Sequence, residues 1–271
     1  MKTILITGAT DGIGLATATE LARQGHEVVV HGRNEDKALH ACDAIRTAVP
    51  NAKLQTAYAD FADLSAVARM AHDLVTRLPR LDVLVNNAGV YKTEWETTDD
   101  GFEMTLAVNH LAHFLLTNLL LPLLKKSAAP RVVTLSSMVH ASGRIVFEDM
   151  NGDRGYNGYH AYANSKLANA LFANELARRA PWLTSNSLHP GVVGTMLLHA
   201  AFSMPGDAAP NGARTSVYLA TSAEVAKRTG KYFDNCTEVA AAPPALDQQL
   251  ARQLWAWSEQ AVRDFMQVHE Q

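Results

Sequence analysis

The chain has 271 residues, a formal net charge of −3, 48% hydrophobic residues and 19% charged residues. This composition excludes wholesale disorder, and the length suits one large α/β domain or two small ones. Because no surplus of basic residues is present to neutralise phosphates, we expect no nucleic-acid partner.

Cysteine usage and hydropathy together predict a cytoplasmic protein. Cys42 and Cys236 form no Cys-x-x-Cys pair and no disulfide framework, which fits a reducing compartment. The longest apolar stretch, residues 111–124, is shorter than the roughly 20 residues that span a bilayer and contains polar side chains. The first residues read as a strand rather than a signal peptide. We therefore expect no membrane anchor.

Strand and helix patterns alternate along the whole chain. In chain order they predict a strand at 2–7, a helix at 13–24, a strand at 27–31, a helix at 34–48, a strand at 53–59, a helix at 63–78, a strand at 81–85, a helix at 101–126, a strand at 131–136, a helix at 161–179, a strand at 184–188, a helix at 211–222, a strand at 230–233 and a helix at 246–268. Residues 137–160 and 191–210 read as loops. This alternation predicts βαβ units on a parallel sheet, and no linker or repeat interrupts it. We therefore expect one doubly wound, Rossmann-like α/β domain over 1–271.

The first strand-to-helix turn carries glycines at positions 8, 12 and 14. Without Cβ atoms, backbone N–H groups can approach a pyrophosphate closely, and the helix that follows directs its positive end at the same charge. An ordinary glycine-rich turn is the alternative, but the position between a strand and a helix favours a dinucleotide site. The predicted contacts are Gly8, Thr10, Asp11, Gly12, Ile13 and Gly14.

The end of the second predicted strand indicates which nucleotide binds. An acidic residue about 20 residues after the glycine turn binds the ribose hydroxyls of NAD. Here the strand continues into His31, Gly32, Arg33 and Asn34, with no carboxylate. An arginine attracts a 2′-phosphate, so we expect NADP(H) to be preferred over NAD(H). The alternative is that Arg33 is a solvated arginine at a helix start.

Tyr162 and Lys166 lie four residues apart in a predicted helix, so their side chains share one face, about 6 Å apart along the axis. A phenol is a poor base at neutral pH, and a nearby ammonium lowers its pKa. The pair can therefore act as a general acid or base toward an alcohol or carbonyl oxygen.

Other polar groups fall at the same edge of the predicted sheet. The sequence Asn86-Asn87-Ala88-Gly89 follows the fourth strand, Ser136-Ser137 ends the fifth, and His189-Pro190-Gly191 follows the sixth. Asn109 lies inside the long apolar helix, where an amide needs a partner. In an open parallel sheet the ligand crevice lies at the carboxyl ends of the strands, which is where these groups are expected.

In this order, the glycine turn, Asn86 to Gly89, Asn109, Ser137, Tyr162 with Lys166, and Pro190-Gly191 resemble the classical short-chain dehydrogenase/reductase family over residues 2 to 235. The retinol-dehydrogenase-like branch is the most similar. The segments that carry the likeness to this branch are 100–103, 108–111, 113–117, 165–169, 189–193 and 230–233.

The resemblance implies a role for each matching residue. Tyr162 would donate or accept the proton, Lys166 would hold the nicotinamide ribose, and Ser137 would bind the substrate oxygen. Asn109 would anchor a water-mediated proton path to Lys166. The other cofactor contacts implied are Arg33, Asn34, Asp60, Phe61, Asn87, Ala88, Gly89, Pro190, Gly191, Val192 and Thr195.

The chain departs from the common family pattern between the serine and the tyrosine. Ser137 and Tyr162 are 25 residues apart, longer than in many members, and the retinol-dehydrogenase-like branch also has a long loop here. The region of about 192–210 would form a lid over the substrate. Its apolar residues favour a lipophilic carbonyl or alcohol as the small-molecule substrate.

Rival interpretations remain at this level. A catalytically silent NADP(H)-sensing protein would bind the cofactor without chemistry, although such proteins usually lack the Tyr162–Lys166 pair. We expect no metal, because His140, His160 and His189 lack ligand spacing. The apolar stripe at Leu115, Leu116, Leu119, Leu120 and Leu123 fits either the core or a homodimer or homotetramer interface.

Overall fold

The computed structural model describes residues 1–194 and 206–266. Its first half contains β1 (Thr3–Ile6), α1 (Gly12–Arg23), β2 (Glu27–Gly32), α2 (Glu35–Ala48), β3 (Lys53–Tyr58), α3 (Leu64–Arg77), β4 (Val83–Asn86), α4 (Met104–Leu106), the π-helical turn η1 (Ala107–Leu111) and α5 (Ala112–Leu124). Its second half contains β5 (Arg131–Leu135), the 3₁₀ turns η2 (Met138–Ser142) and η3 (Phe147–Asp149), α6 (Gly158–Arg179), β6 (Thr184–His189), α8 (Ala209–Thr221), β7 (Tyr232–Asp234), β8 (Thr237–Val239), α9 (Pro243–Leu246), α10 (Gln248–Ala261) and α11 (Arg263–Met266).

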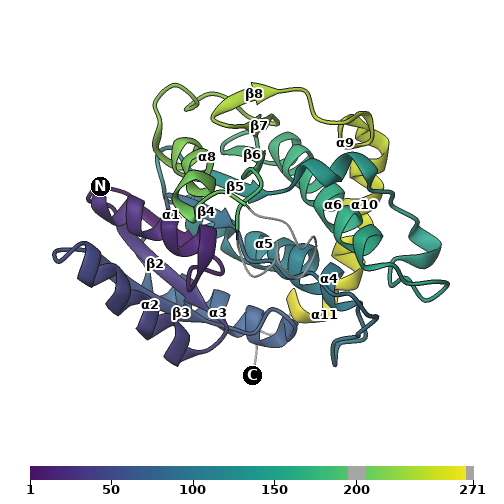
Figure 1. Ribbon diagram of the computed structural model, residues 1–271, viewed down its shortest axis with the longest axis horizontal. Coiled ribbons are helices and arrows are strands. Elements are labelled where there is room, and N and C mark those ends of the chain that lie inside the picture. Colours follow the sequence, from purple (N-terminus) through teal and green to yellow (C-terminus); the bar gives the residue numbers. More distant parts are fainter. Residues whose placement is uncertain (195–205, 267–271) are drawn as a thin grey trace.

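The strands form one eight-stranded sheet in the order β3-β2-β1-β4-β5-β6-β7-β8 (Figure 1). Neighbours from β3 to β7 pair in parallel, as the alternation of strands and helices predicts. The strand order reverses between β1 and β4, which makes their carboxyl ends the topological switch point. The doubly wound α/β fold is therefore confirmed.

Strand β8 was missed by the sequence pattern. It pairs antiparallel with β7 through a tight turn at Asn235 and Cys236, which have φ values of 45° and 61°. Two-residue hairpin turns of this kind usually contain glycine, and this one has none.

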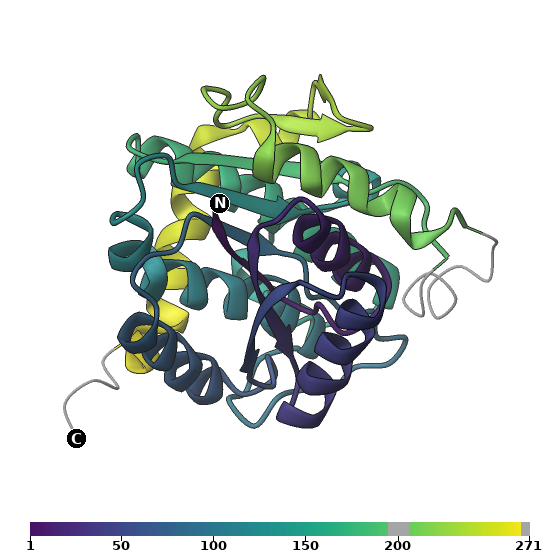
Figure 2. The same ribbon diagram turned by 90° about the vertical axis from the view of Figure 1, so that its left-hand side faces the viewer.

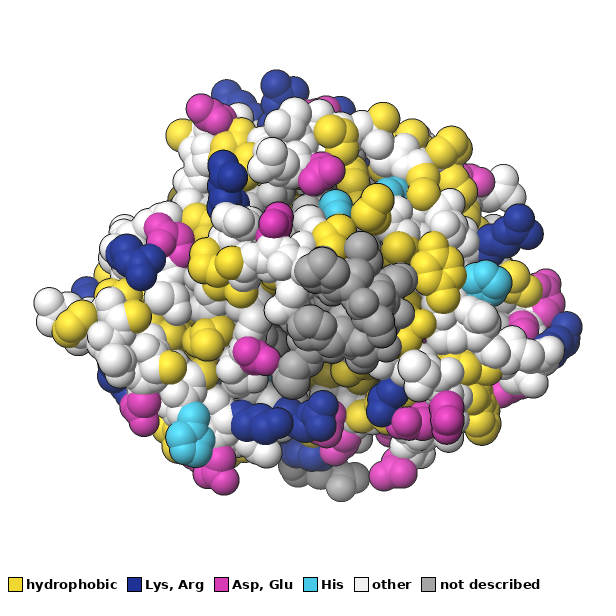
Figure 3. Space-filling view, viewed as in Figure 1, with side chains coloured by type: hydrophobic (Ala, Val, Ile, Leu, Met, Phe, Trp, Pro, Cys, Tyr) yellow, Lys and Arg dark blue, Asp and Glu magenta, His cyan; other side chains and the backbone are white. Residues whose placement is uncertain are grey.

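Helices cover both faces of the sheet (Figures 1 and 2). Successive residues of β1 face opposite sides, so Leu5 packs in one core cluster with α3, α5 and α6, whereas Ile4 and Ile6 pack in another with α1, α2 and α8. Both faces are thus buried, as parallel sheets require. On the face seen in Figure 3, acidic and basic side chains are interspersed, in keeping with the small net charge.

The predicted helix at 101–126 is helical only from Met104 to Leu124, and a π-turn at Ala107–Leu111 interrupts it. Its start is set by Glu103, whose carboxylate accepts the backbone N–H groups of Thr105 and Leu106. Met104–Leu124 is long and apolar enough to cross a membrane, with a mean hydropathy of 1.4 over its most apolar 18 residues, but 78% of those residues are buried inside the protein. The apolar stripe on α5 is core, apart from the partly buried Leu119.

The C-terminal region also departs from the single helix expected at 246–268. In the described residues it is divided into α9, α10 and α11, and α10 packs along α6. Trp255 on α10 stacks against Phe172 with ring centroids 5.8 Å apart and meets Phe114 edge-on at 4.9 Å. This chain's own helix therefore covers apolar surface of α5 and α6.

Within the long loop between β5 and α6, helix α6 begins at Gly158, earlier than residue 161, because the Asn157 side chain caps it by accepting the N–H of His160. Most of the expected lid, residues 195–205, lies outside the described residues.

Candidate active site

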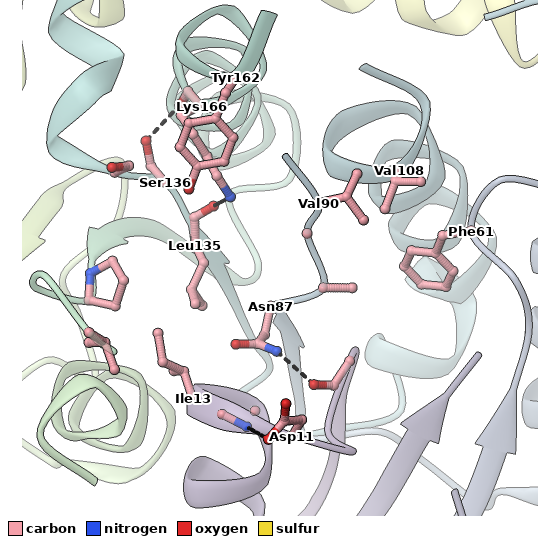
Figure 4. A pocket seen from close by; sticks show the side chains of 18 of the residues that line it. Asp11, Ile13, Phe61, Asn87, Val90, Val108, Leu135, Ser136, Tyr162 and Lys166 are labelled. Atoms are coloured by element: carbon pink, nitrogen blue, oxygen red, sulfur yellow. Dashed lines mark hydrogen bonds between the residues drawn. The ribbon is translucent and has the colours of Figure 1, made fainter. Parts of the chain in front are cut away.

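A cleft of about 770 Å³ lies at the carboxyl ends of the strands, across the switch point between β1 and β4 (Figure 4). The predicted site residues that line it are Gly8, Thr10, Asp11, Gly12, Ile13, Gly14, Arg33, Asp60, Phe61, Asn87, Ala88, Gly89, Ser137, Tyr162, Lys166, Pro190, Gly191 and Val192. Asn34 and Asn109 do not line the cleft, and Thr195 lies outside the described residues. The fold thus brings together segments that are far apart in the sequence.

The glycine turn is built by close backbone packing. Gly8 and Gly12 have positive φ values, of 62° and 52°, which side chains disfavour. A Cβ on Gly14 would lie 2.1 Å from the carbonyl oxygen of Gly8. The Asn87 amide donates to that oxygen and to the carbonyl oxygen of Thr7, at 3.1 and 2.7 Å. Replacing Gly14 would push α1 away from the turn.

Two cations and one carboxylate line the far end of the cleft. Arg33 and Lys37 both line it, and the Nε atom of Arg33 lies 3.8 Å from a carboxylate oxygen of Asp60. Asn34 instead caps α2, because its side chain accepts the Lys37 N–H. This cap places Lys37 one turn inside the helix, on the side of Arg33.

These residues fit a nicotinamide dinucleotide. The turn lacks Cβ atoms where a pyrophosphate would lie, and the N-terminus of α1 opens at it. The cleft runs from the Arg33 end to Tyr162, and its volume is in the usual range for a ligand of that size.

Tyr162 and Lys166 point from α6 into the cleft (Figure 4). Both are buried, and the Lys166 Nζ lies 5.4 Å from the centroid of the Tyr162 ring. Lys166 Nζ also donates to the carbonyl oxygen of Leu135, at 3.4 Å. Ser136 Oγ donates to the Lys166 carbonyl oxygen, at 2.7 Å, which ties the end of β5 to α6.

The pKa of Tyr162 shifts in the direction opposite to the one expected from its lysine neighbour. Burial raises this pKa, and a hydrogen bond with the Ser137 side chain only partly offsets the rise. Burial also lowers the pKa of Lys166 to about 8, because the charged ammonium loses its water. In the protein without bound ligands, Tyr162 is therefore a neutral phenol that is ready to donate a proton.

Asn109 sits in the π-turn and is fully buried. Its amide bridges both backbone groups of Val90, at 2.8 and 3.0 Å, and donates to Ser165 Oγ on α6 at 2.9 Å. A Cβ on Gly89 would lie 3.4 Å from Asn109 Oδ1 and 3.6 Å from Lys166 Nζ. Gly89 therefore keeps the space between the asparagine and the lysine open.

Several lining residues were given no catalytic or cofactor contact by the sequence analysis, although Ser136 and His189 were expected at this edge of the sheet. They are His31, Lys37, Ala59, Ala62, Val90, Lys92, Met104, Val108, Leu135, Ser136, Met138, Val139, His189 and Val193. Lys37 could have been found, because it lies in the first turn of the helix that follows Arg33. The apolar members could not, because in sequence they look like core residues.

Three comparisons agree on the family and the fold of this chain. The sequence pattern of short chain dehydrogenases matches residues 2–206. The chain is 43% identical to retinol dehydrogenase 14 of Mus musculus, over 95% of this chain and 85% of that protein. A crystal structure of a protein from Mycobacterium paratuberculosis gives a TM-score of 0.82 at 37% identity, covering 97% of this chain and 94% of that one.

A short-chain dehydrogenase from Shigella flexneri 2a, solved in complex with NADP, gives a TM-score of 0.70 at 28% identity and covers 87% of this chain and 97% of that one. The match covers most of the chain, including the segments that line the cleft up to Val193. The chain belongs to the short-chain dehydrogenase/reductase family of oxidoreductases, in its retinol-dehydrogenase-like branch.

Proposed function

We propose that the protein is an NADP(H)-dependent oxidoreductase that interconverts a lipophilic ketone or aldehyde with its alcohol. The observation that carries this proposal is the buried Tyr162 phenol, which faces the cleft beside Lys166 and within hydrogen-bonding reach of Ser137. These are the groups needed to hold a carbonyl oxygen and give it a proton.

The protonation state of Tyr162 favours carbonyl reduction at neutral pH. The bound cofactor supplies or removes the hydride. Tyr162 gives its proton to the substrate oxygen as the carbonyl is reduced, and Ser137 donates a second hydrogen bond to that oxygen. Because burial raises the pKa of Tyr162, its protonated form dominates, which suits an acid better than a base.

The preference for NADP(H) is supported by charge at the adenosine end. Arg33 and Lys37 line this end, and the strand before them ends without a carboxylate. Two cations fit a 2′-phosphate, which a carboxylate would repel. The Shigella flexneri relative, which is complexed with NADP, supports the same preference.

A lipophilic substrate is supported by the wall of the cleft around Tyr162. Val90, Met104, Val108, Met138 and Val139 line it, and Figure 4 shows Val90 and Val108 facing the cleft opposite Tyr162. An apolar wall with a few placed polar groups selects hydrophobic ligands. The relatives named retinol dehydrogenases are in keeping with this class.

The test is NADPH oxidation with a panel of hydrophobic ketones and aldehydes, retinal among them, beside polar sugar aldehydes. We expect turnover of hydrophobic members and none with Tyr162→Phe. Turnover of sugars alone would overturn the substrate class. Tight NADPH binding without turnover of any carbonyl would instead favour the silent NADP(H)-sensing protein.

A further inference from the structure

Behind the cleft, a buried histidine joins two parts of the site. His113 on α5 is 1% exposed and makes two hydrogen bonds. Its Nδ1 lies 3.0 Å from the carbonyl oxygen of Asn109, in the π-turn, and its Nε2 lies 2.9 Å from the hydroxyl of Thr7, directly before the glycine turn. The imidazole therefore bridges the segment that carries Asn109 and the segment that would hold the cofactor phosphates.

The partners at both ends fix which nitrogen carries the proton. A carbonyl oxygen only accepts, so Nδ1 must be the donor toward Asn109. The Thr7 hydroxyl already accepts the N–H groups of Asn87 and Ala88, at 2.8 and 2.9 Å. It can give its own proton to His113 Nε2 at 2.9 Å or to the Val85 carbonyl at 3.4 Å, and the shorter contact favours the histidine. Both ends thus require the neutral Nδ1–H tautomer.

A second buried histidine has the opposite arrangement. His31 Nδ1 accepts the N–H of Gly8 at 3.0 Å, and its Nε2 lies 3.1 Å from the carbonyl oxygen of Ala59, so it must be the Nε2–H tautomer. Phe61 lies between the two imidazoles, with centroids 4.5 Å from His31 and 5.2 Å from His113. Burial holds the pKa of His31 at about 4 and that of His113 at about 3, so both stay neutral at neutral pH.

We propose that His113 is a positioning residue with two separable functions: its Nδ1–H fixes the Asn109 carbonyl for catalysis, and its Nε2 fixes Thr7 and the glycine turn for cofactor binding. This inference rests on the proposed function for its catalytic half only. The π-turn explains the need for the bond to the Asn109 carbonyl. In this segment a backbone N–H bonds the carbonyl five residues earlier, as Ala112 N–H bonds Ala107 O, rather than the carbonyl four residues earlier. The His113 side chain supplies a donor to the carbonyl four residues earlier, that of Asn109.

Two amide substitutions separate the functions. An asparagine amide reaches about as far as Nδ1 and can still donate to Asn109, whereas a glutamine amide reaches about as far as Nε2 and can still accept from Thr7. We expect His113→Gln to lower kcat about tenfold with the NADPH Kd within about twofold, because a buried carbonyl loses its partner. We expect His113→Asn to raise the NADPH Kd about fivefold with a smaller change in kcat.

His110→Gln is the matched control. His110 lies on the same long helix, is equally buried, and bonds Ser258 of α10 rather than the glycine turn. It should lower the melting temperature and leave kcat and the NADPH Kd unchanged. If both His113 variants behave as this control does, or if both shift kcat and Kd together, the proposal is overturned.

A readout without substrate separates this inference from the proposed function. Long-range ¹H–¹⁵N correlation spectra of protein labelled with ¹⁵N-histidine should show a signal from a neutral histidine with the proton on Nδ1 that is absent in His113→Gln. The signal of His140 should remain, because its Nδ1 lies 2.7 Å from the Ser137 carbonyl oxygen and its Nε2 accepts the Ala242 N–H. An Nε2–H tautomer or an imidazolium at His113 would overturn the inference. If the wild type turns over no carbonyl, the proposed function fails, while the spectra and the NADPH Kd values still decide on His113.

Discussion

Replacing Arg33 by alanine is expected to weaken NADPH binding about tenfold and to leave NADH binding within about twofold. Arg33 lines the cleft, and its side chain is 62% exposed, so water screens its attraction for a phosphate. Between unit charges about 4 Å apart, the attraction is about 1 kcal/mol in water and about 4 kcal/mol near a protein surface. An exposed guanidinium belongs near the lower limit, and 1.4 kcal/mol is a factor of ten in Kd.

Lys37 provides an internal check on this magnitude. It lines the same end of the cleft, so the Arg33→Ala, Lys37→Ala double variant should lose more NADPH affinity than either single variant. Arg46→Ala is the matched control. Arg46 lies in the last turn of α2, the helix that carries Lys37, pairs with Asp43 and does not line the cleft. Fluorescence titration at low and high salt measures both Kd values, and the effect should shrink with salt. An equal loss for NADH and NADPH, or none for either, would refute the role of these cations.

Three further predictions concern stability and assembly. The free energy of unfolding, measured in urea, should fall as the pH drops from about 6.5 to 4. Burial holds the pKa values of His31 and His110 at about 4 and that of His113 at about 3 in the folded protein. In this pH range the unfolded chain therefore binds about three more protons than the folded protein, and acid favours unfolding. A flat profile would contradict their neutral burial. Trp255→Ala should cost about 3–5 kcal/mol of unfolding free energy, since its indole is buried against two phenylalanines; a loss below about 1 kcal/mol would show that α10 is not docked. Light scattering should give a monomer of 29.4 kDa, because α10 covers apolar surface of α5 and α6, and a stable dimer or tetramer would contradict this.

The parts of the fold that follow from local patterns were predictable. The alternation of β-branched runs and capped helices gave the parallel sheet, and glycines at 8, 12 and 14 marked the turn at its switch point. The spacing of Tyr162 and Lys166 put both on one helix face, because helical periodicity is a local property. Their pKa shifts did not follow from sequence, since burial depends on the whole tertiary structure.

The features that escaped prediction depend on contacts distant in sequence or on unusual backbone geometry. The π-turn at Asn109 has no local marker in an otherwise apolar helix. The hairpin between β7 and β8 turns at Asn235 and Cys236 without a glycine. His113 reads as a core residue of its helix. Its Nδ1 finds a local partner in the Asn109 carbonyl, but its Nε2 has one only because Thr7, directly after β1 and 106 positions earlier, approaches it.

The central claim is that the Tyr162 hydroxyl moves the proton in a carbonyl reduction. The direct measurement is NADPH oxidation by wild type and Tyr162→Phe on one hydrophobic aldehyde, beside the NADPH Kd of each. Because the phenylalanine lacks only the hydroxyl, it should lower kcat by a factor of about 100 or more while the Kd stays within about twofold. Undiminished turnover by Tyr162→Phe with unchanged cofactor binding would contradict the account.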